Sequence, residues 1–180
     1  SGGDIIYISG FFDEVVTMNK AVSLVGTDPL TDGIISTGSG RVIIYNTDIS
    51  GDFEISNLTI SGGNATGNGA GININKCSSS SILLKNLIVE NNTTTAQGGG
   101  LTLNSANITM TDCIIRNNSA KNGGGLHLVS NNVSSGDKTI NIHSTLVTGN
   151  NSSLNGAGLY VFAGSTTIGL TVNIENSTIR

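Results

Sequence analysis

The chain has 180 residues, of which 12 are acidic and 8 are Lys or Arg, so its formal net charge is −4. Charged residues make up only 11% of the chain and aromatic residues 4%, while 25 residues are glycine. Such a chain lacks the basic footprint of a protein that binds nucleic acid or an anionic membrane surface. No apolar run approaches the roughly 20 residues that span a bilayer, so no membrane insertion is expected.

The first strands are expected close to the N-terminus. Alternating apolar residues predict a first coil with strands near 5–8, 15–18 and 22–25, and a second coil over 34–45. Aromatic side chains are concentrated in this part of the chain: Tyr7, Phe11, Phe12, Tyr45 and Phe53. We expect them to cap the open end of a core, because an exposed strand edge invites association. For Phe11 and Phe12, a platform on which a sugar ring stacks is the alternative.

A repeat dominates the rest of the chain. Four times a glycine triplet, or Gly-Ala-Gly, leads into an aliphatic strand, with steps of 29, 25 and 33 residues between the copies that begin at Gly69, Gly98, Gly123 and Gly156. Self-similarity at this period is typical of a solenoid. The strands between the corners alternate with period two and are rich in β-branched residues. The sequence therefore predicts an all-β fold, a parallel β-helix of about six to seven coils.

Two kinds of corner recur in the aligned copies. The glycine corners are Gly69, Gly71, Gly98, Gly100, Gly123, Gly125, Gly156 and Gly158, and the polar corners are Asn57, Asn86, Asp112, Ser144 and Asn176. Glycine supplies positive φ, and Asn, Asp and Ser tolerate it or bond their own backbone. Stacked asparagines can also bond one another along the rod. We expect both sets to be structural corners and not a functional site.

The chain is expected to form one continuous domain. Residues 1–49 are predicted to be N-terminal coils with capping aromatics, and residues 50–180 repeated coils that continue beyond Arg180 in the native protein. The unequal steps of the repeat are explained by insertions at 76–81 and 131–138. We expect these loops to bulge outward and to contact a partner, because recognition residues are usually carried by loops.

Few residues are candidates for catalysis or metal binding. Asp48, Asp52 and Glu54 form the densest acidic group, with Asp28 and Asp32 nearby in sequence; solvated turns are the expected role and calcium binding the alternative. His127 and His143 lie on strands of neighbouring coils and are expected to face outward, with a metal-binding or catalytic pair as the alternative. The basic residues Arg41, Arg116 and Arg180 do not align with an acidic face. No catalytic residue, cofactor or metal is predicted.

The cysteines and the glycosylation motifs leave alternatives open. Cys113 replaces leucine in earlier copies and is expected to be a small buried side chain, while Cys77 lies in a loop; a disulfide between them is the alternative. Several Asn-x-Ser/Thr triplets occur, among them those at Asn64, Asn91, Asn107 and Asn132. In a host that glycosylates such motifs, outward-facing ones would carry glycans.

The corners resemble the repeats of the polymorphic outer-membrane-protein type, GGA[ILV] and FxxN. Gly99-Gly100-Leu101 and Gly124-Gly125-Leu126 resemble the first motif, and the segments ending at Asn92, Asn118 and Asn150 resemble the second with Val or Ile in place of Phe. The opening segment from Asp4 is similar to the first coil of pectin-lyase-like right-handed parallel β-helices. The resemblance covers about residues 50–180 and implies a right-handed parallel β-helix of an adhesin-like surface protein.

The expected function is therefore that of a non-enzymatic extracellular protein at the cell surface. It would be an adhesin-like stalk or passenger region, or a surface-fibre subunit, without a cofactor. A host-cell or glycan ligand would bind through the outer loops, and copies could associate end to end. The first alternative is a fragment of a β-helix polysaccharide lyase or glycoside hydrolase whose catalytic coils lie beyond Arg180. The second is a phage or virus fibre segment.

Overall fold

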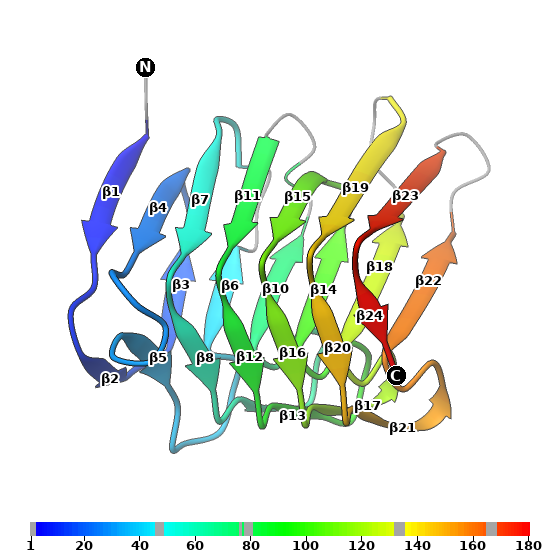
Figure 1. The fold of residues 1–180 in the computed structure, drawn as a ribbon, viewed down its shortest axis with the longest axis horizontal. Helices are drawn as coiled ribbons and strands as arrows, with labels where there is room; N and C mark the ends of the chain where they lie inside the picture. Colours follow the sequence, from blue (N-terminus) through cyan, green and yellow to red (C-terminus); the bar gives the residue numbers. More distant parts are fainter. Residues whose placement is uncertain (1–2, 46–48, 76, 78–80, 132–135, 165–168) are drawn as a thin grey trace.

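The structure is a computed structural model that describes residues 3–45, 49–75, 77, 81–131, 136–164 and 169–180. No residue in this described part is helical. Its strands form four sheets, named A to D, that run along one stack. In Figure 1 two sheets (A and B) face the viewer, a third (C) lies behind sheet A, and a fourth, short sheet (D) lies at the bottom. The prediction of an all-β parallel solenoid is confirmed.

The strands of each sheet are successive visits of the chain to the same side of the stack. Sheet A contains β1 (Asp4–Tyr7), β4 (Val22–Val25), β7 (Phe53–Ser56), β11 (Ser81–Lys85), β15 (Asn107–Thr111), β19 (Lys138–His143) and β23 (Leu170–Glu175). Sheet B contains β2 (Phe11–Asp13), β5 (Gly33–Ile35), β8 (Thr59–Ser61), β12 (Ile88–Glu90), β16 (Ile114–Arg116), β20 (Leu146–Thr148) and β24 (Thr178–Ile179).

The other two sheets close the turn. Sheet C contains β3 (Val16–Met18), β6 (Ile43–Tyr45), β10 (Ile72–Asn75), β14 (Leu101–Asn104), β18 (Leu126–Ser130) and β22 (Leu159–Ala163). Sheet D contains β9 (Asn64–Ala65), β13 (Thr93–Thr94), β17 (Ser119–Asn122) and β21 (Asn151–Asn155). Each complete turn therefore runs from sheet A through B and D to C.

All pairings between these strands are parallel and bring equivalent residues of neighbouring turns together. Ile108 of β15, for example, pairs with Ile82 of β11 on one side and Ile140 of β19 on the other. Of the seven strands in sheet A, the first and last have a neighbour on one side only. The stack makes about five turns, slightly fewer than the six to seven predicted.

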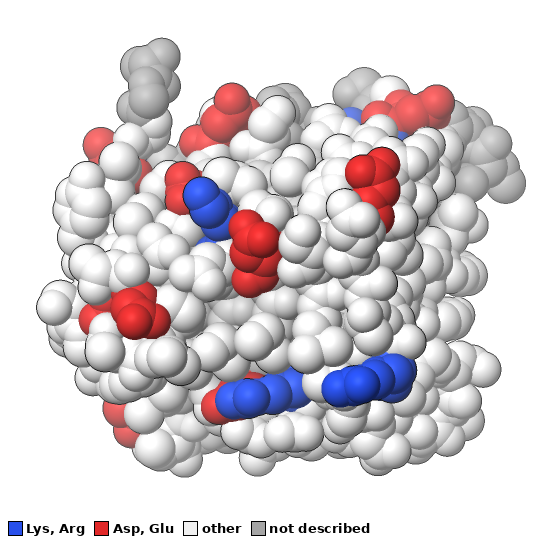
Figure 2. Space-filling view, in the orientation of Figure 1, with Lys and Arg blue, Asp and Glu red and all other residues white. Residues whose placement is uncertain are grey.

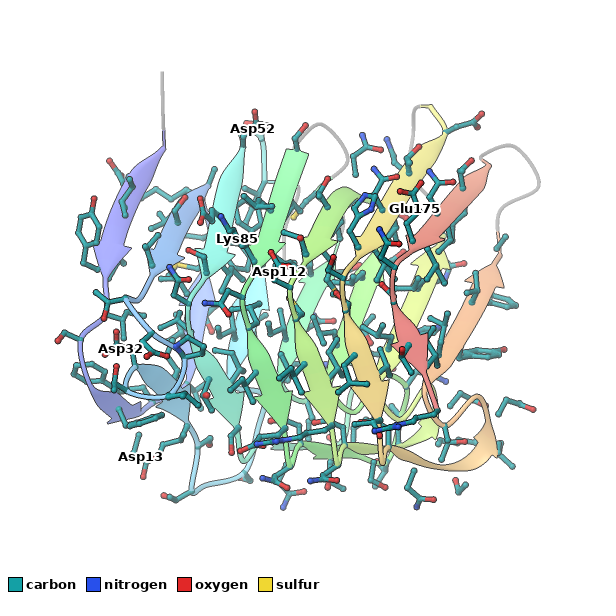
Figure 3. The ribbon with its side chains drawn as sticks, in the orientation of Figure 1. Asp13, Asp32, Asp52, Lys85, Asp112 and Glu175 are labelled. Carbon is teal, nitrogen blue, oxygen red and sulfur yellow. The ribbon has the colours of Figure 1, made fainter. Side chains whose placement is uncertain are left out.

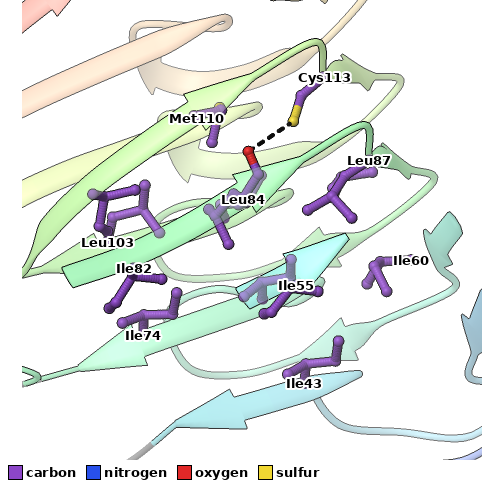
Figure 4. Close-up of a cluster of buried hydrophobic side chains, with 14 of the residues drawn as sticks. Ile43, Ile55, Ile60, Ile74, Ile82, Leu84, Leu87, Leu103, Met110 and Cys113 are labelled. Atoms are coloured by element: carbon purple, nitrogen blue, oxygen red, sulfur yellow. Dashed lines mark hydrogen bonds between the residues drawn. The ribbon is translucent and has the colours of Figure 1, made fainter. Parts of the chain in front are cut away.

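Aliphatic side chains from sheets A, B and C fill the interior (Figure 4). Ile72, Leu101 and Leu126 follow one another on β10, β14 and β18, and all three are fully buried. Burying a side chain of this size contributes about 1.5–3 kcal/mol. Because each row of aliphatic residues continues from turn to turn, every turn is stabilised mainly by its two neighbours.

Two expectations for the N-terminal coils were wrong. Val22–Val25 does not complete the first turn; it pairs with Asp4–Tyr7 and so begins the second turn in sheet A. The missed strand of the first turn is Phe11–Asp13, which pairs with Gly33–Ile35. Its two adjacent phenylalanines hid the alternation of a strand, and only the pairing with the next turn reveals it.

The five aromatic residues divide into two groups. Tyr7, Phe11 and Phe12 are exposed on the first turn, where capping was expected. Tyr45 and Phe53 are instead buried, and their rings stack with centroids 4.2 Å apart. The Tyr45 hydroxyl donates a 2.6 Å hydrogen bond to the Val22 carbonyl, so this pair joins successive turns inside the core.

Both cysteines are buried, and they form no disulfide. The Cys113 thiol lies 3.7 Å from the Leu84 carbonyl oxygen (Figure 4), and burial raises its pKa to about 12. The expected role of Cys113 as a small buried side chain is confirmed. Cys77 lies between β10 and β11, outside any strand as predicted, and is also fully buried.

Candidate functional site

The polar corners lie where the chain passes from sheet A to sheet B. Asn57, Asn86, Asp112, Ser144 and Asn176 all have positive φ, between 47° and 56°. The Asn86 side-chain amide donates to Asn57 Oδ1 at 2.9 Å, and Asn57 in turn donates to the Gly26 carbonyl at 3.1 Å. These residues turn the backbone and connect adjacent turns.

The glycines of each triplet have two different roles. Gly69, Gly98, Gly123 and Gly156, the first of each triplet, have positive φ. The third glycine of each triplet, such as Gly100, does not have positive φ, although positive φ was expected at all of these corners. A Cβ on Gly100 would lie 2.6 Å from the Gly125 carbonyl oxygen of the next turn, so this position requires glycine for close packing.

A buried asparagine column was missed by sequence reasoning. Asn92 and Asn118 are almost fully buried, and Asn118 Oδ1 accepts hydrogen bonds from both the backbone N and Nδ2 of Asn92, each at 3.0 Å. Asn118 Nδ2 donates to the Val89 carbonyl at 2.9 Å and to Asn150 Oδ1 at 3.0 Å. The signal was present in the FxxN-like turns, in which the asparagine always follows Val or Ile by three residues.

A groove of about 670 Å³ lies across the outer face of sheet A. Hydroxyl, amide, aliphatic and carboxylate groups from five successive strands line it: Ser23, Asp52, Phe53, Glu54, Ser81, Ile82, Leu83, Asn107, Ile108, Thr109, Thr139 and Asn141. The register explains this set, because Leu83 pairs with Glu54 and Thr109, and Thr109 with Asn141. The groove therefore runs along the stack.

Side-chain hydrogen bonds to the backbone of the neighbouring turn fix the edge of this groove. Asp52 Oδ1 accepts from the Ser81 backbone N at 2.8 Å, and Asn107 Oδ1 accepts from the Thr139 backbone N at 3.0 Å. Asp52 lies at the upper end of the sheet in Figure 3. On this face some basic and acidic side chains touch, and wide areas between them are uncharged (Figure 2). Apart from Asp52 and Glu54, the residues that line the groove are neutral.

The predicted acidic group is divided by the fold. Asp52 and Glu54 share the sheet A groove, whereas Asp28 and Asp32 belong to the loop between β4 and β5. Asp48 is outside the described residues. Asp32 is almost fully buried, and its carboxylate accepts hydrogen bonds from the backbone N of Gly10 at 2.8 Å and from the N and Oγ1 of Thr27 at 2.7 Å each.

These hydrogen bonds predict that Asp32 stabilises the fold less as the pH falls. The Gly10 amide, followed by the Thr27 amide and hydroxyl, holds the pKa of Asp32 far below its usual range. A carboxylate whose folded pKa is depressed stabilises the fold above its unfolded pKa of about 4 and loses that contribution as the pH falls. We expect urea midpoints between pH 6 and pH 3 to fall less steeply for Asp32→Asn than for the unaltered chain. Parallel pH profiles of the two proteins would contradict this role of Asp32.

The remaining candidates do not converge. His127 lies on sheet C and His143 on sheet A, where His143 Nδ1 is 3.4 Å from a Glu175 carboxylate oxygen. Arg116 forms an ion pair with Glu90 at 2.6 Å. Arg41 Nε donates to the Asn68 carbonyl at 2.6 Å, and Arg180 Nε to Thr148 Oγ1 at 3.3 Å.

The described residues contain neither a metal-binding cluster nor a membrane-spanning helix. Among them, no three or more His, Cys, Asp or Glu side chains are grouped so that they could hold a metal ion. Nor does that part of the chain contain a helix long and apolar enough to cross a membrane.

Phe11 and Phe12 do not form a joint sugar platform. Adjacent residues of a strand point to opposite faces. Phe12 lines an apolar hollow of about 330 Å³ at the first turn, together with Ile6 and Met18. On the other side, a Cβ on Gly33 would come within 2.8 Å of the Phe11 ring, so Phe11 packs against the next turn.

Most of the two predicted partner loops lies outside the described residues, namely 76, 78–80 and 132–135. The motif at Asn132 lies there as well. Among the other glycosylation motifs, Asn64 and Asn91 are exposed and Asn107 is half-buried.

Comparison with known proteins adds no relative. No protein-family model matches the chain, and no significant match was found among curated proteins or solved structures. The parallel solenoid, its buried asparagine column and the sheet A groove are therefore the findings from which a function must be argued.

Proposed function

We propose that this protein is a non-enzymatic, extracellular protein of adhesin-like type, in which the solenoid is a surface stalk, passenger region or fibre subunit. The sheet A groove would be its binding face. The observation that carries the proposal is that residues of five successive strands line one continuous groove. A solenoid presents such extended surfaces along its axis, where one turn follows another at about 4.8 Å.

The chemistry of the groove favours an extended, polar partner such as a glycan chain. Its hydroxyls and amides, among them Ser23, Thr109 and Asn141, recur from turn to turn and can both donate and accept hydrogen bonds. Aliphatic groups such as Leu83 lie between them. A partner that lies along the stack would meet a similar set of groups at each turn.

The solenoid is also suited to hold such a face rigid. Parallel backbone ladders connect every pair of neighbouring turns, and the buried asparagine column adds side-chain bonds between them. The low charge and the resemblance of the glycine and FxxN-like corners to surface-protein repeats support the extracellular location.

The proposal predicts that a bulky charge in the groove abolishes binding. Thr109→Arg places a long cationic side chain at the middle of the groove, and we expect it to lower retention of the protein on an array of immobilised glycans at least tenfold. Ser61→Arg is the matched control, because Ser61 lies outside the groove on sheet B beside Glu90. Equal retention of both variants and the unaltered protein would contradict the groove as the binding face.

A second candidate rests on one observation. Asp52 and Glu54 line the same groove, and glycoside hydrolysis uses a pair of carboxylates. A polysaccharide-cleaving enzyme would therefore use this face as well. The two candidates differ in whether a bound polymer is cleaved.

A further inference from the structure

A second pocket, of about 240 Å³, lies on the outer face of sheet C, on a different sheet from the groove. Three rings line it: His127 of β18, and Tyr160 and Phe162 of β22. Tyr160 and Phe162 alternate with Leu159 and Val161, whose partners Leu126 and Leu128 are core residues, so the two rings point outward. In a chain with 4% aromatic residues, three rings on one outer surface need an explanation.

The three rings are nearly parallel. His127 and Tyr160 have centroids 5.5 Å apart and an interplanar angle of 15°, and Tyr160 and Phe162 have centroids 6.5 Å apart and an angle of 13°. Phe162 is 46% exposed, whereas His127 is only 5% exposed. His127 therefore covers one face of Tyr160, and Phe162, beside Tyr160, is much more open to solvent than His127.

The remaining walls of the pocket are side-chain amides, from Asn68, Gln97, Asn122 and Asn131. Asn68 Oδ1 accepts from the Gln97 backbone N at 3.2 Å, and Asn122 Oδ1 accepts from Asn155 Nδ2 at 2.9 Å. Within the described residues, none of the four side-chain NH₂ groups donates to another group of the protein. Two amide oxygens are therefore held in place, and the four amides give the pocket both donors and acceptors.

His127 adds an independent sign of a missing partner. Its Nδ1 is buried and has no hydrogen-bond partner among the described residues, which is costly for a polar atom. Burial lowers the pKa of His127 to about 4, so the ring is neutral at pH 7 and offers an acceptor or a donor without charge. The lining contains no Asp, Glu, Lys or Arg, so the pocket fits a neutral ligand.

We propose that this sheet C pocket binds one ring of a neutral carbohydrate. The apolar face of the sugar would stack on Tyr160 and Phe162, and its hydroxyls would bond the amides and reach His127. The volume is below the roughly 300–1,000 Å³ of pockets for drug-sized ligands, which fits a single ring. This inference goes beyond the proposed function, because it assigns a ligand class to a surface that the groove does not include.

The test is a calorimetric titration of the 180-residue chain with glucose, galactose, mannose and N-acetylglucosamine, with galacturonic acid as the charged probe. We expect at least one neutral sugar to bind with a millimolar Kd and galacturonic acid to bind at least tenfold more weakly. Tyr160→Ala is expected to lower the affinity for the neutral sugar at least tenfold. Tyr160→Phe keeps the ring, and its affinity for the neutral sugar is expected to stay within about threefold of that of the unaltered chain. This variant keeps the test usable if the alanine variant does not fold.

Two further variants separate this pocket from the other surfaces. Tyr7→Ala removes a 78% exposed aromatic ring from the first turn and is expected to leave sugar affinity unchanged. Ser61→Arg, on sheet B outside both the groove and this pocket, is also expected to leave sugar affinity unchanged. The inference is overturned if none of the neutral sugars binds at 50 mM, or if Tyr7→Ala lowers affinity as much as Tyr160→Ala does.

Discussion

Replacing Asn118 with alanine is expected to lower the free energy of unfolding by about 4 kcal/mol, since an orphaned buried polar group costs about 1–3 kcal/mol. The side chain is 1% exposed and makes four hydrogen bonds to the two neighbouring turns. Its loss leaves the Asn92 backbone N and the Val89 carbonyl without their asparagine partner. It also opens a cavity next to Gly100, whose added Cβ would lie 3.0 Å from Asn118 Nδ2.

Asn141→Ala is the matched control. Asn141 also takes part in an asparagine pair, accepting from Asn173 Nδ2 at 2.8 Å, but this pair lies on the exposed face of sheet A. Water replaces the lost bond there, so the expected change is about 0.5 kcal/mol or less. Chemical denaturation of the three proteins measures the difference. A similar loss for both variants would show that the buried column is no more important than a surface pair.

Gly100→Ala is expected to destabilise the fold by about 2–3 kcal/mol, as other overpacked cores are destabilised. The added methyl group would lie 2.6 Å from the Gly125 carbonyl oxygen and 3.0 Å from Asn118 Nδ2. The backbone oxygen cannot move without stretching the ladder between the two turns. The third position is glycine in all four copies, whereas the second accepts alanine at Ala70 and Ala157.

Gly38→Ala is the control for this substitution. Gly38 has no positive φ, and nothing lies within 4 Å of an added Cβ. Alanine there restricts the unfolded chain, so we expect stability to stay the same or to rise by up to about 1 kcal/mol. Thermal unfolding of both variants checks the contrast. Equal midpoints would mean that the contact at Gly100 is relieved by movement of the neighbouring turn.

The fold could be predicted because two independent signals agreed. Alternation within short segments predicted strands, and the glycine repeat predicted that these strands return to the same place in each turn. The polar corners were also visible, because only some residue types tolerate the positive φ found at Asn57 and Asn86. Strand Phe11–Asp13 was missed because two consecutive apolar residues carry no alternation.

The inward direction of the asparagine column could not be read from the sequence. It depends on the residue before each member: Asn91 and Asn117 have φ of 55° and 56°, and this turns the following side chain into the core. The same two residues could have held an exposed turn with the amides in water. Only the register of the stack shows that Asn92 and Asn118 face each other at hydrogen-bond distance.

The two proposed binding surfaces combine residues from several turns. Leu83 and Thr109 of the groove belong to different turns, as do His127 and Tyr160 of the sheet C pocket. His127 and Tyr160 each follow the glycine triplet and one Leu, so the aligned copies place them at equivalent positions, but only the structure shows that their rings stack. Surfaces of a solenoid are columns across turns, and a column is known only when the pairing register is known.

The most direct measurement of the central claim follows binding and turnover of one polymer in one experiment. The glycan retained best on the array is incubated with the 180-residue chain, and bound protein and newly formed reducing or unsaturated ends are measured over one day. Binding that Thr109→Arg abolishes, with no new chain ends, is the predicted result. Product formation that disappears in Asp52→Asn or Glu54→Gln would contradict it and would identify the groove as an active site.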